Sequence, residues 1–241
     1  MRPISFLSLV LVMLASPAFP QAGMDTAFIS VAIKNSQSLY QKAIGAQARL
    51  FNGSKYLAPE HTIEQHPFLS SEDWLTGSVF YDGEYFQNVP LMYDLTSGQL
   101  ITEHLTSGQA IQLVWDKLDY FSIGDRYFEK IDATATGNTL PETEFYEILY
   151  SGKTRLVAKR EKILREEIRA TVIERSFEEK NRYFFFKNGT FFPVKSKASI
   201  LKLMADKKTE MKRFLKQQRL PFAQNREKLL IRLAEHYDTL K

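Results

Sequence analysis

The sequence predicts an α+β protein that is mostly an antiparallel β meander, with an N-terminal helix and a C-terminal helical hairpin. Between about residues 76 and 195, short runs rich in Val, Ile, Tyr and Phe alternate with turn pairs, which is typical of consecutive hairpins. Towards both ends of the chain, apolar residues recur at helical spacing instead. The meander is expected to form a sandwich, a partly open barrel or a curved sheet.

Residues 1–22 have the three parts of a secretory signal peptide: a basic start, a short apolar run and small residues. The apolar run from 4 to 14 is about half of the roughly 20 residues that a membrane-spanning helix needs. Cleavage is expected after Ala18 or Ala22, and Ala22 is preferred because it removes a Phe-Pro start. We therefore expect a periplasmic or secreted mature protein. The alternative is an uncleaved amphipathic or buried helix.

The mature chain is expected to be stabilised by an ordinary hydrophobic core. The sequence contains no cysteine, which excludes disulfides and lipid attachment through a thiol at the cleavage site. About 220 residues remain after the signal peptide, enough for one large domain or a domain with an appendage. No later segment approaches the length of a membrane span.

Residues 23–50 are predicted to form the N-terminal helix, and residues 51–75 an irregular loop. Apolar residues from Phe28 to Leu50 share one helical face, and Asn52-Gly53 ends the helix because this pair tolerates positive φ. Pro59 and Pro67 then bracket a polar segment.

Residues 76–195 are predicted to form the antiparallel β domain. Five turn pairs divide its strands: Asp82-Gly83, Ser97-Gly98, Gly124-Asp125, Ser151-Gly152 and Asn188-Gly189. The Asp-Gly and Asn-Gly pairs are the strongest signals, because a type I′ turn needs positive φ at both central positions. The highly charged stretch 159–169 is expected to be either an exposed strand extension or a short helix.

Residues 196–241 are predicted to form a basic helical hairpin that packs on the sheet or on a partner. An apolar stripe from Ile200 to Leu215 is surrounded by lysines and arginines. Leu220-Pro221 interrupts this helix, and Asn225 caps a second one.

Two segments resemble uncharacterised exported proteins of Bacteroidota. They are GSVFYDGEYFQNVPLMYDL at 77–95 and KSKASILKLM at 195–204, and the resemblance covers roughly residues 50–241. It implies a location in the cell envelope. It implies no activity and no catalytic residue.

Charge is distributed unevenly along the chain. Residues 1–150 contain 8 Lys and Arg against 17 Asp and Glu, whereas residues 151–241 contain 24 against 11. The basic half, and the segment 195–219 in particular, is suited to anionic lipid headgroups or acidic glycans. The alternatives are packing against the acidic half or a solvated helix face. Nucleic acid is not an expected partner of an exported protein.

The histidines do not predict a metal site. His61 and His66 are five residues apart, about 140° around a helix, whereas zinc-binding helices place two histidines four apart. A polar surface loop is the preferred interpretation. His104 and His236 are isolated in the sequence. We therefore predict no metal, cofactor-binding or catalytic residue.

Two functions are weighed against each other, and a purely structural subunit is a third possibility. Glu84, Asp94, Asp116 and Asp119 offer the paired carboxylates with which a hydrolase would act on envelope glycans. Carboxylates near hairpin turns usually serve turn geometry instead. We therefore favour a non-enzymatic envelope protein that binds a ligand or a partner, with an envelope protein, lipid or glycan as the partner.

Aromatic residues recur in adjacent pairs along the predicted strands. Tyr85-Phe86, Tyr120-Phe121, Tyr127-Phe128 and Phe145-Tyr146 are such pairs, and Tyr183 to Phe186 is a longer run. Adjacent residues point to opposite faces of a sheet, so each pair places one ring on each face. One face is core, and the other is either exposed to a ligand or covered by the terminal helices.

Overall fold

The computed structural model divides the chain into two units, residues 1–43 and 44–241. It describes residues 29, 31–33, 35–36, 45, 49–58, 63, 65–134, 140–169, 172–218, 222 and 224–240. The predicted signal peptide lies outside the described residues. Of the predicted N-terminal helix, residues 29, 31–33 and 35–36 are helical, and Arg49–Phe51 form a 3₁₀ turn.

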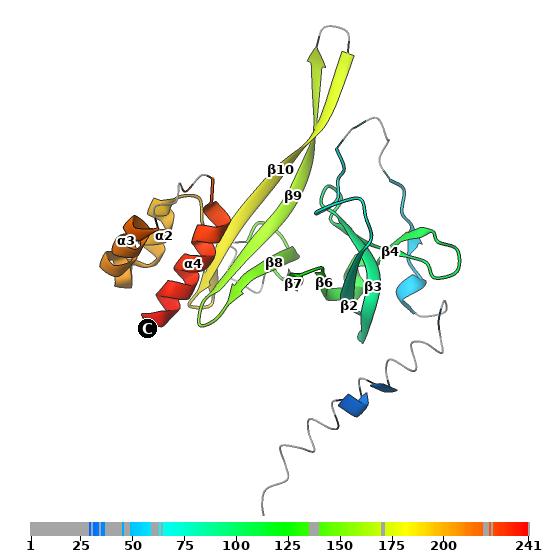
Figure 1. Ribbon diagram of the computed structural model, residues 1–241, viewed down its shortest axis with the longest axis horizontal. Coiled ribbons are helices and arrows are strands. Elements are labelled where there is room, and N and C mark those ends of the chain that lie inside the picture. Colours follow the sequence, from blue (N-terminus) through cyan, green and yellow to red (C-terminus); the bar gives the residue numbers. More distant parts are fainter. Residues whose placement is uncertain are drawn as a thin grey trace, which may run out of the picture. The chain divides into compact units, whose positions relative to one another are not determined.

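The second unit is built on one open antiparallel sheet of eleven strands, which confirms the predicted fold class (Figure 1). Its order is β1-β5-β4-β3-β2-β6-β7-β8-β9-β10-β11. The strands are β1 (Ser54–Lys55), β2 (Leu75–Tyr81), β3 (Glu84–Asp94), β4 (Gln99–Glu103), β5 (Ala110–Gln112), β6 (Leu118–Ile123), β7 (Arg126–Ile131), β8 (Glu144–Ser151), β9 (Arg155–Arg169), β10 (Val172–Lys187) and β11 (Thr190–Pro193).

All five predicted hairpins are present, and two have the expected type I′ geometry. Asp82 and Gly83 have φ of 53° and 81°, and Asn188 and Gly189 have φ of 52° and 80°. The five turn pairs join β2–β3, β3–β4, β6–β7, β8–β9 and β10–β11. The turn chemistry therefore determines most of the strand connections.

The charged stretch 159–169 is the outer part of β9 and is exposed from residue 164 to 168, so its interpretation as a short helix is wrong. It pairs along its whole length with the first half of β10, from Lys159 opposite Arg182 to Arg169 opposite Val172. Cross-strand hydrogen bonding and alternating opposite charges stabilise an extended chain here. Arg165 and Glu178, for example, form an ion pair of 2.7 Å between the strands.

β2 lies in the middle of the sheet and joins two halves that are each continuous in sequence. It pairs with β3 on one side and with β6 on the other. At Gly77, a β-carbon would lie 2.1 Å from the carbonyl oxygen of Ser122. Only glycine therefore allows β2 and β6 to approach this closely, next to the bulge at Gly77/Ser78.

The segment 65–69 bridges the opening between β3 and β9. Phe68 forms an isolated bridge with Asp94 at the end of β3. From β9, the Lys162 ammonium donates hydrogen bonds to the carbonyl oxygens of His66 and Phe68, at 2.9 and 2.8 Å. The Lys162 backbone N–H donates to Leu95. These contacts hold the curved sheet without closing it into a barrel.

The largest core lies on one face of β2, β3, β6, β7 and β8. We call this the core face; it carries Val79, Phe121 and Phe128, which are opposite one another in the register. Leu50, Leu69, Leu95 and Leu113 from the connecting segments complete this core. The opposite side of β2 and β6, with the adjoining parts of β3 and β7, is called the open face; further along β3 and at β8 this side carries the buried Met92 and Tyr146.

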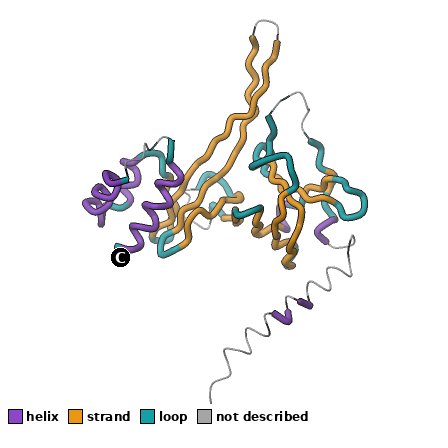
Figure 2. Tube along the Cα trace, viewed as in Figure 1, coloured by secondary structure: helices purple, strands orange, loops and turns teal. Residues whose placement is uncertain are grey.

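Three helices cover the sheet at β8, β9 and β10. They are α2 (Lys197–Leu203), α3 (Lys208–Gln217) and α4 (Arg226–Thr239), drawn as a group of purple coils in Figure 2. Their apolar residues form one core with Leu156, Ala158, Tyr183 and Phe185. No helix in the described part of the chain is long and apolar enough to span a membrane.

The first helix of the predicted C-terminal hairpin is divided in two. It is interrupted at Met204, and the 3₁₀ turn Ala205–Lys207 follows. Asp206 in this turn accepts hydrogen bonds from the Lys187 ammonium at 2.7 Å and from the Tyr237 hydroxyl at 2.8 Å. The interruption therefore provides a carboxylate that connects the sheet to α4.

Candidate functional site

The aromatic pairs of β3, β6 and β7 place one ring in the core and one on the open face. Phe86, Phe121 and Phe128 are buried on the core face. Tyr85, Tyr120 and Tyr127, the preceding residue in each pair, are all at least partly exposed. The alternation of a half-covered sheet thus produces three solvent-accessible tyrosines on neighbouring strands.

These tyrosines form a continuous row with Phe80 of β2. The ring centroids are 6.4 Å apart for Tyr85 and Tyr120, 5.1 Å for Phe80 and Tyr120, and 5.7 Å for Tyr120 and Tyr127. Tyr85, Phe80 and Tyr120 are direct cross-strand neighbours in the register. We call these four residues the aromatic row. None of them belongs to a buried hydrophobic cluster of the described residues.

Ring orientation decides which surfaces of the row a ligand would contact. Phe80 and Tyr120 are stacked with an interplanar angle of 15°, so their facing surfaces contact each other. At this pair the row therefore presents ring edges, whereas the rings of Tyr85 and Tyr127 are tilted by 39° and 42° to that of Tyr120. Tyr127, at the β7 end, is 39% exposed and is the most accessible member.

The hydroxyls of Tyr120 and Tyr127 stay neutral at physiological pH. Burial, together with the neighbouring Tyr85 and Asp119, raises the pKa of Tyr120 above its ordinary value. Burial, with Glu129 as the next contributor, raises the pKa of Tyr127 in the same direction. A neutral phenol both donates and accepts a hydrogen bond.

Polar groups continue this surface on the open face. The hydroxyls of Ser78 and Ser122 lie 2.8 Å apart. Next to Tyr127, the Arg155 guanidinium donates to the Glu129 carboxylate at 2.7 Å, and this pair is partly exposed. The surface therefore combines aromatic rings with hydroxyl, carboxylate and guanidinium groups.

Where β8 lies beside the inner parts of β9 and β10, by contrast, both faces of the sheet are covered. Phe145 and Tyr146 are both buried, as are Phe184 and Phe185. Tyr146 and Phe184 pack in a cluster with Leu140, on the side opposite the helices. The sequence left open whether the second face of the sheet is exposed or covered. It is exposed at the aromatic row and covered where β8 lies beside β9 and β10.

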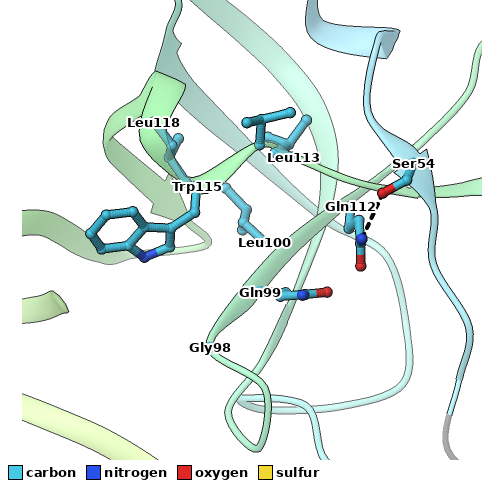
Figure 3. Close-up of a pocket in the computed structure, with 9 residues that line it drawn as sticks. Ser54, Gly98, Gln99, Leu100, Gln112, Leu113, Trp115 and Leu118 are labelled. Carbon is cyan, nitrogen blue, oxygen red and sulfur yellow. Dashed lines mark hydrogen bonds between the residues drawn. The ribbon is translucent and has the colours of Figure 1, made fainter.

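A small pocket lies near the opposite edge of the sheet (Figure 3). Its volume is about 220 Å³, below the roughly 300–1,000 Å³ of ordinary small-molecule sites. The side-chain amide of Gln112 donates to the Ser54 hydroxyl at 2.6 Å in its wall. Trp115 lines another part, with the Lys130 ammonium 4.2 Å from its ring centroid. This pocket suits a few water molecules or a small polar group.

The histidines are in separate places. His61 lies outside the described residues. His66 stacks on Phe68, and the ring of His104 accepts hydrogen bonds from the two backbone N–H groups of its own turn. His236 stacks on an aromatic ring of α3. Within the described ranges, no group of three or more His, Cys, Asp or Glu side chains could hold a metal.

The four carboxylates considered for hydrolysis do not form one site. Glu84 and Asp94 are at opposite ends of β3, roughly 33 Å apart at 3.3 Å per residue. Asp94 accepts hydrogen bonds from the Tyr56 hydroxyl and from the N–H groups of its own turn. Asp116 and Asp119 are exposed. Asp94 therefore serves turn geometry, as such residues usually do.

Most of the basic residues of 195–219 that the structure describes lie just before α2 or on the outer sides of α2 and α3. Lys195, Lys202, Lys212 and Lys216 are exposed, while Ile200 and Met211 of the same segment are buried. This is the arrangement of an amphipathic helix on a core.

Phe80 is the member of the aromatic row that the sequence pattern did not predict. It has no aromatic residue immediately before it, and Tyr81, which follows, points to the core. Its place on β2 opposite Tyr85 and Tyr120 is a consequence of the sheet order. The run Ser78-Val79-Phe80-Tyr81 could have indicated this position, because alternation along a strand places Phe80 on the face opposite the buried Val79.

The fold and this surface define an α+β protein with an open antiparallel sheet and an accessible aromatic row. Comparison of the chain with known protein families, with curated proteins and with solved structures finds no match.

Proposed function

We propose that this chain is an exported, non-enzymatic binding protein of the cell envelope, and that the aromatic row binds a glycan. The row carries the proposal: four aromatic side chains, each in contact with the next, lie on the open face, and none of them belongs to a buried hydrophobic cluster of the described residues. Exposed aromatic patches of this kind mark binding surfaces. The signal-peptide pattern and the resemblance to exported proteins of Bacteroidota support the envelope location.

The chemistry of the row favours a glycan over a lipid. A sugar ring has apolar C–H groups that pack on aromatic carbon, and hydroxyls that exchange hydrogen bonds with phenols. Tyr120 and Tyr127 offer both kinds of contact, and the Ser78–Ser122 pair adds hydroxyls. An acyl chain needs an apolar cavity instead, and the pocket near Trp115 is small and partly polar.

The shape of the row indicates how the ligand lies. Tyr85, Phe80 and Tyr120 follow one line across three strands, and Tyr127 continues it on a fourth. A surface that extends across four strands suits several consecutive sugars better than a single one. The Arg155–Glu129 pair beside Tyr127 offers a contact for a charged or amide substituent.

Binding to defined glycans tests this proposal. The mature chain is titrated with N-acetylglucosamine oligomers and sedimented with purified peptidoglycan, and vesicles of phosphatidylglycerol and phosphatidylethanolamine serve as the lipid probe. Binding to one of the glycans is expected. Tyr127→Ala removes the most exposed ring, and we expect roughly tenfold weaker binding, equivalent to about 1.4 kcal/mol.

Phe192→Ala is the matched control. Phe192 lies on β11, outside the aromatic row, and is 37% exposed, close to the 39% of Tyr127. It should bind like the unmodified chain. Equal effects of the two substitutions, or binding to vesicles and to no glycan, would show that the proposal is wrong.

A further inference from the structure

The outer halves of β9 and β10 form a two-stranded ribbon that extends beyond the rest of the sheet (Figure 1). We call residues 159–169 and 172–182 the distal hairpin. β8 pairs with β9 only over residues 155–158, and β11 pairs with β10 only over 184–187. Among the strands that the structure describes, none pairs with either outer edge of the distal hairpin.

Such a ribbon is a weak structure by itself. A single two-stranded hairpin is at best marginally stable in water, and an open strand edge is a template for further pairing. The distal hairpin also exposes apolar side chains: Ile168 is 79% exposed, and its cross-strand neighbour Ile173 is 55% exposed. A partner strand along one edge would stabilise this part of the chain.

The backbone of β10 shows which of its groups face outward. The Phe177 N–H donates a hydrogen bond of 2.7 Å to the side-chain oxygen of Gln65 and therefore points away from β9. Because strand groups alternate, residues 173, 175, 179 and 181 also direct their N–H and C=O groups to this edge. An antiparallel partner must place its own outward-facing residues opposite these.

We propose that the distal hairpin pairs with a second copy of this chain, β10 against β10, antiparallel and centred on Phe177. In this register Arg175 faces Glu179 of the other copy, and Glu174 faces Lys180. Two-fold symmetry repeats both charge pairs, so the interface contains four of them. Opposite charges directly across two strands are favourable, and like charges are not.

The neighbouring registers lack this complementarity. Shifting the centre to residue 176 places Glu174 opposite Glu178 of the other copy. Shifting it to residue 178 places the two Glu178 side chains opposite each other. A centre at residue 175 places the two Arg175 side chains opposite each other, and a centre at residue 179 does the same with the two Glu179 side chains. The edge is therefore self-complementary in the register centred on Phe177.

Gln65 and the second copy would use the same donor. In the single chain, the Gln65 side chain accepts the hydrogen bond from the Phe177 N–H. In the pair, the Phe177 carbonyl oxygen of the other copy takes its place. Gln65→Ala should therefore leave pairing intact or strengthen it.

The absence of cysteine makes a direct test possible. In a hydrogen-bonded antiparallel pair, opposite Cα atoms are about 5.5 Å apart, within the range that a disulfide spans. Phe177→Cys is introduced into the mature chain, which is oxidised mildly and run on a non-reducing gel. We expect a covalent dimer linked through position 177. Ile168→Cys, which is more exposed but lies on β9, is the control and should remain mostly monomeric.

A charge exchange tests the register independently. Arg175→Glu places two Glu–Glu contacts in the dimer, and we expect its Kd, measured by analytical ultracentrifugation, to rise roughly tenfold or more. The double variant Arg175→Glu/Glu179→Arg restores the opposite pairs and should recover the dimer. Circular dichroism melts establish that each variant is folded.

Three outcomes would overturn the proposal. They are a monomeric unmodified chain at high concentration, equal cross-linking at positions 168 and 177, and a double charge variant no better than the single one. None of these measurements depends on a glycan, so the dimer and the proposed binding function stand or fall separately.

Discussion

The carboxylate of Glu147 joins three parts of the structure, and its removal is expected to be strongly destabilising. It is 5% exposed and accepts two hydrogen bonds of 2.7 Å from Arg126 on β7 and one of 2.5 Å from Arg160 on β9. Arg160 also contacts Glu227 at the start of α4, at 2.6 Å. Glu147→Gln keeps the side-chain shape and removes the negative charge between two guanidinium groups.

The expected loss is about 3–5 kcal/mol in the free energy of unfolding, the cost of breaking a buried ion pair by removing one partner. It is measured by urea denaturation of the chain from residue 23 onward. With an m-value of about 2 kcal/mol/M, the unfolding midpoint should fall by roughly 2 M. Asp82→Asn is the control, because Asp82 forms a partly exposed ion pair with Lys117 and should cost less than about 1 kcal/mol.

The effect should also depend on pH. Burial alone would raise the pKa of Glu147, but the hydrogen bond from Arg126 and the charges of Arg160 and Arg126 outweigh it, so the pKa is lowered. The stabilisation is then fully present above the unfolded-state pKa of about 4.3 and is lost as the pH falls through the lower folded-state value. A difference between the unmodified chain and Glu147→Gln that is small at pH 7, or constant down to pH 2, would refute this reasoning.

Two further substitutions test contacts that join parts distant in sequence. Gly152→Ala should lower the melting temperature by an amount equivalent to about 1–3 kcal/mol. The added β-carbon would lie 2.4 Å from the Tyr150 hydroxyl and 2.5 Å from the buried Asp238 carboxylate. The control Ser151→Ala, at an exposed neighbouring position, should have little effect. Lys162→Met should lower the free energy of unfolding, measured by urea denaturation, by about 1–3 kcal/mol. Methionine keeps the apolar part of the side chain and removes the donor to two carbonyl oxygens. An unchanged unfolding midpoint would show that the bridge between β3 and β9 contributes nothing to stability.

The strand connections were predictable because turn chemistry is local. Asp82-Gly83 and Asn188-Gly189 adopt the conformation that their residue types favour, and the flanking strands follow from it. The outer part of β10, residues 172 to 182, could not be recognised as a strand of its own from the sequence, because charged residues interrupt its alternation of apolar side chains. Its strand structure depends on pairing with β9.

The aromatic row was predictable only in part. The pairs Tyr85-Phe86 and Tyr120-Phe121 indicate one ring on each face, and the structure confirms this. Which part of the sheet is covered on both faces depends on contacts between residues far apart in the sequence: the C-terminal helices pack against Phe185, whereas Ile131 and Leu140 pack with Phe184 on the other face. The same aromatic pattern at Phe184-Phe185 is therefore buried on both sides.

The central position of β2 has a kinetic consequence. Most strand pairs of this sheet are sequential hairpins, and such local contacts form quickly. Val79 of β2 and its partner Phe121 of β6, however, are separated by about 40 residues, and closing a loop of that length costs roughly 3 kcal/mol of chain entropy. The pairing of β2 with β6 is thus the step at which two locally assembled meanders must meet, and substitutions there should slow folding more than substitutions in the hairpins.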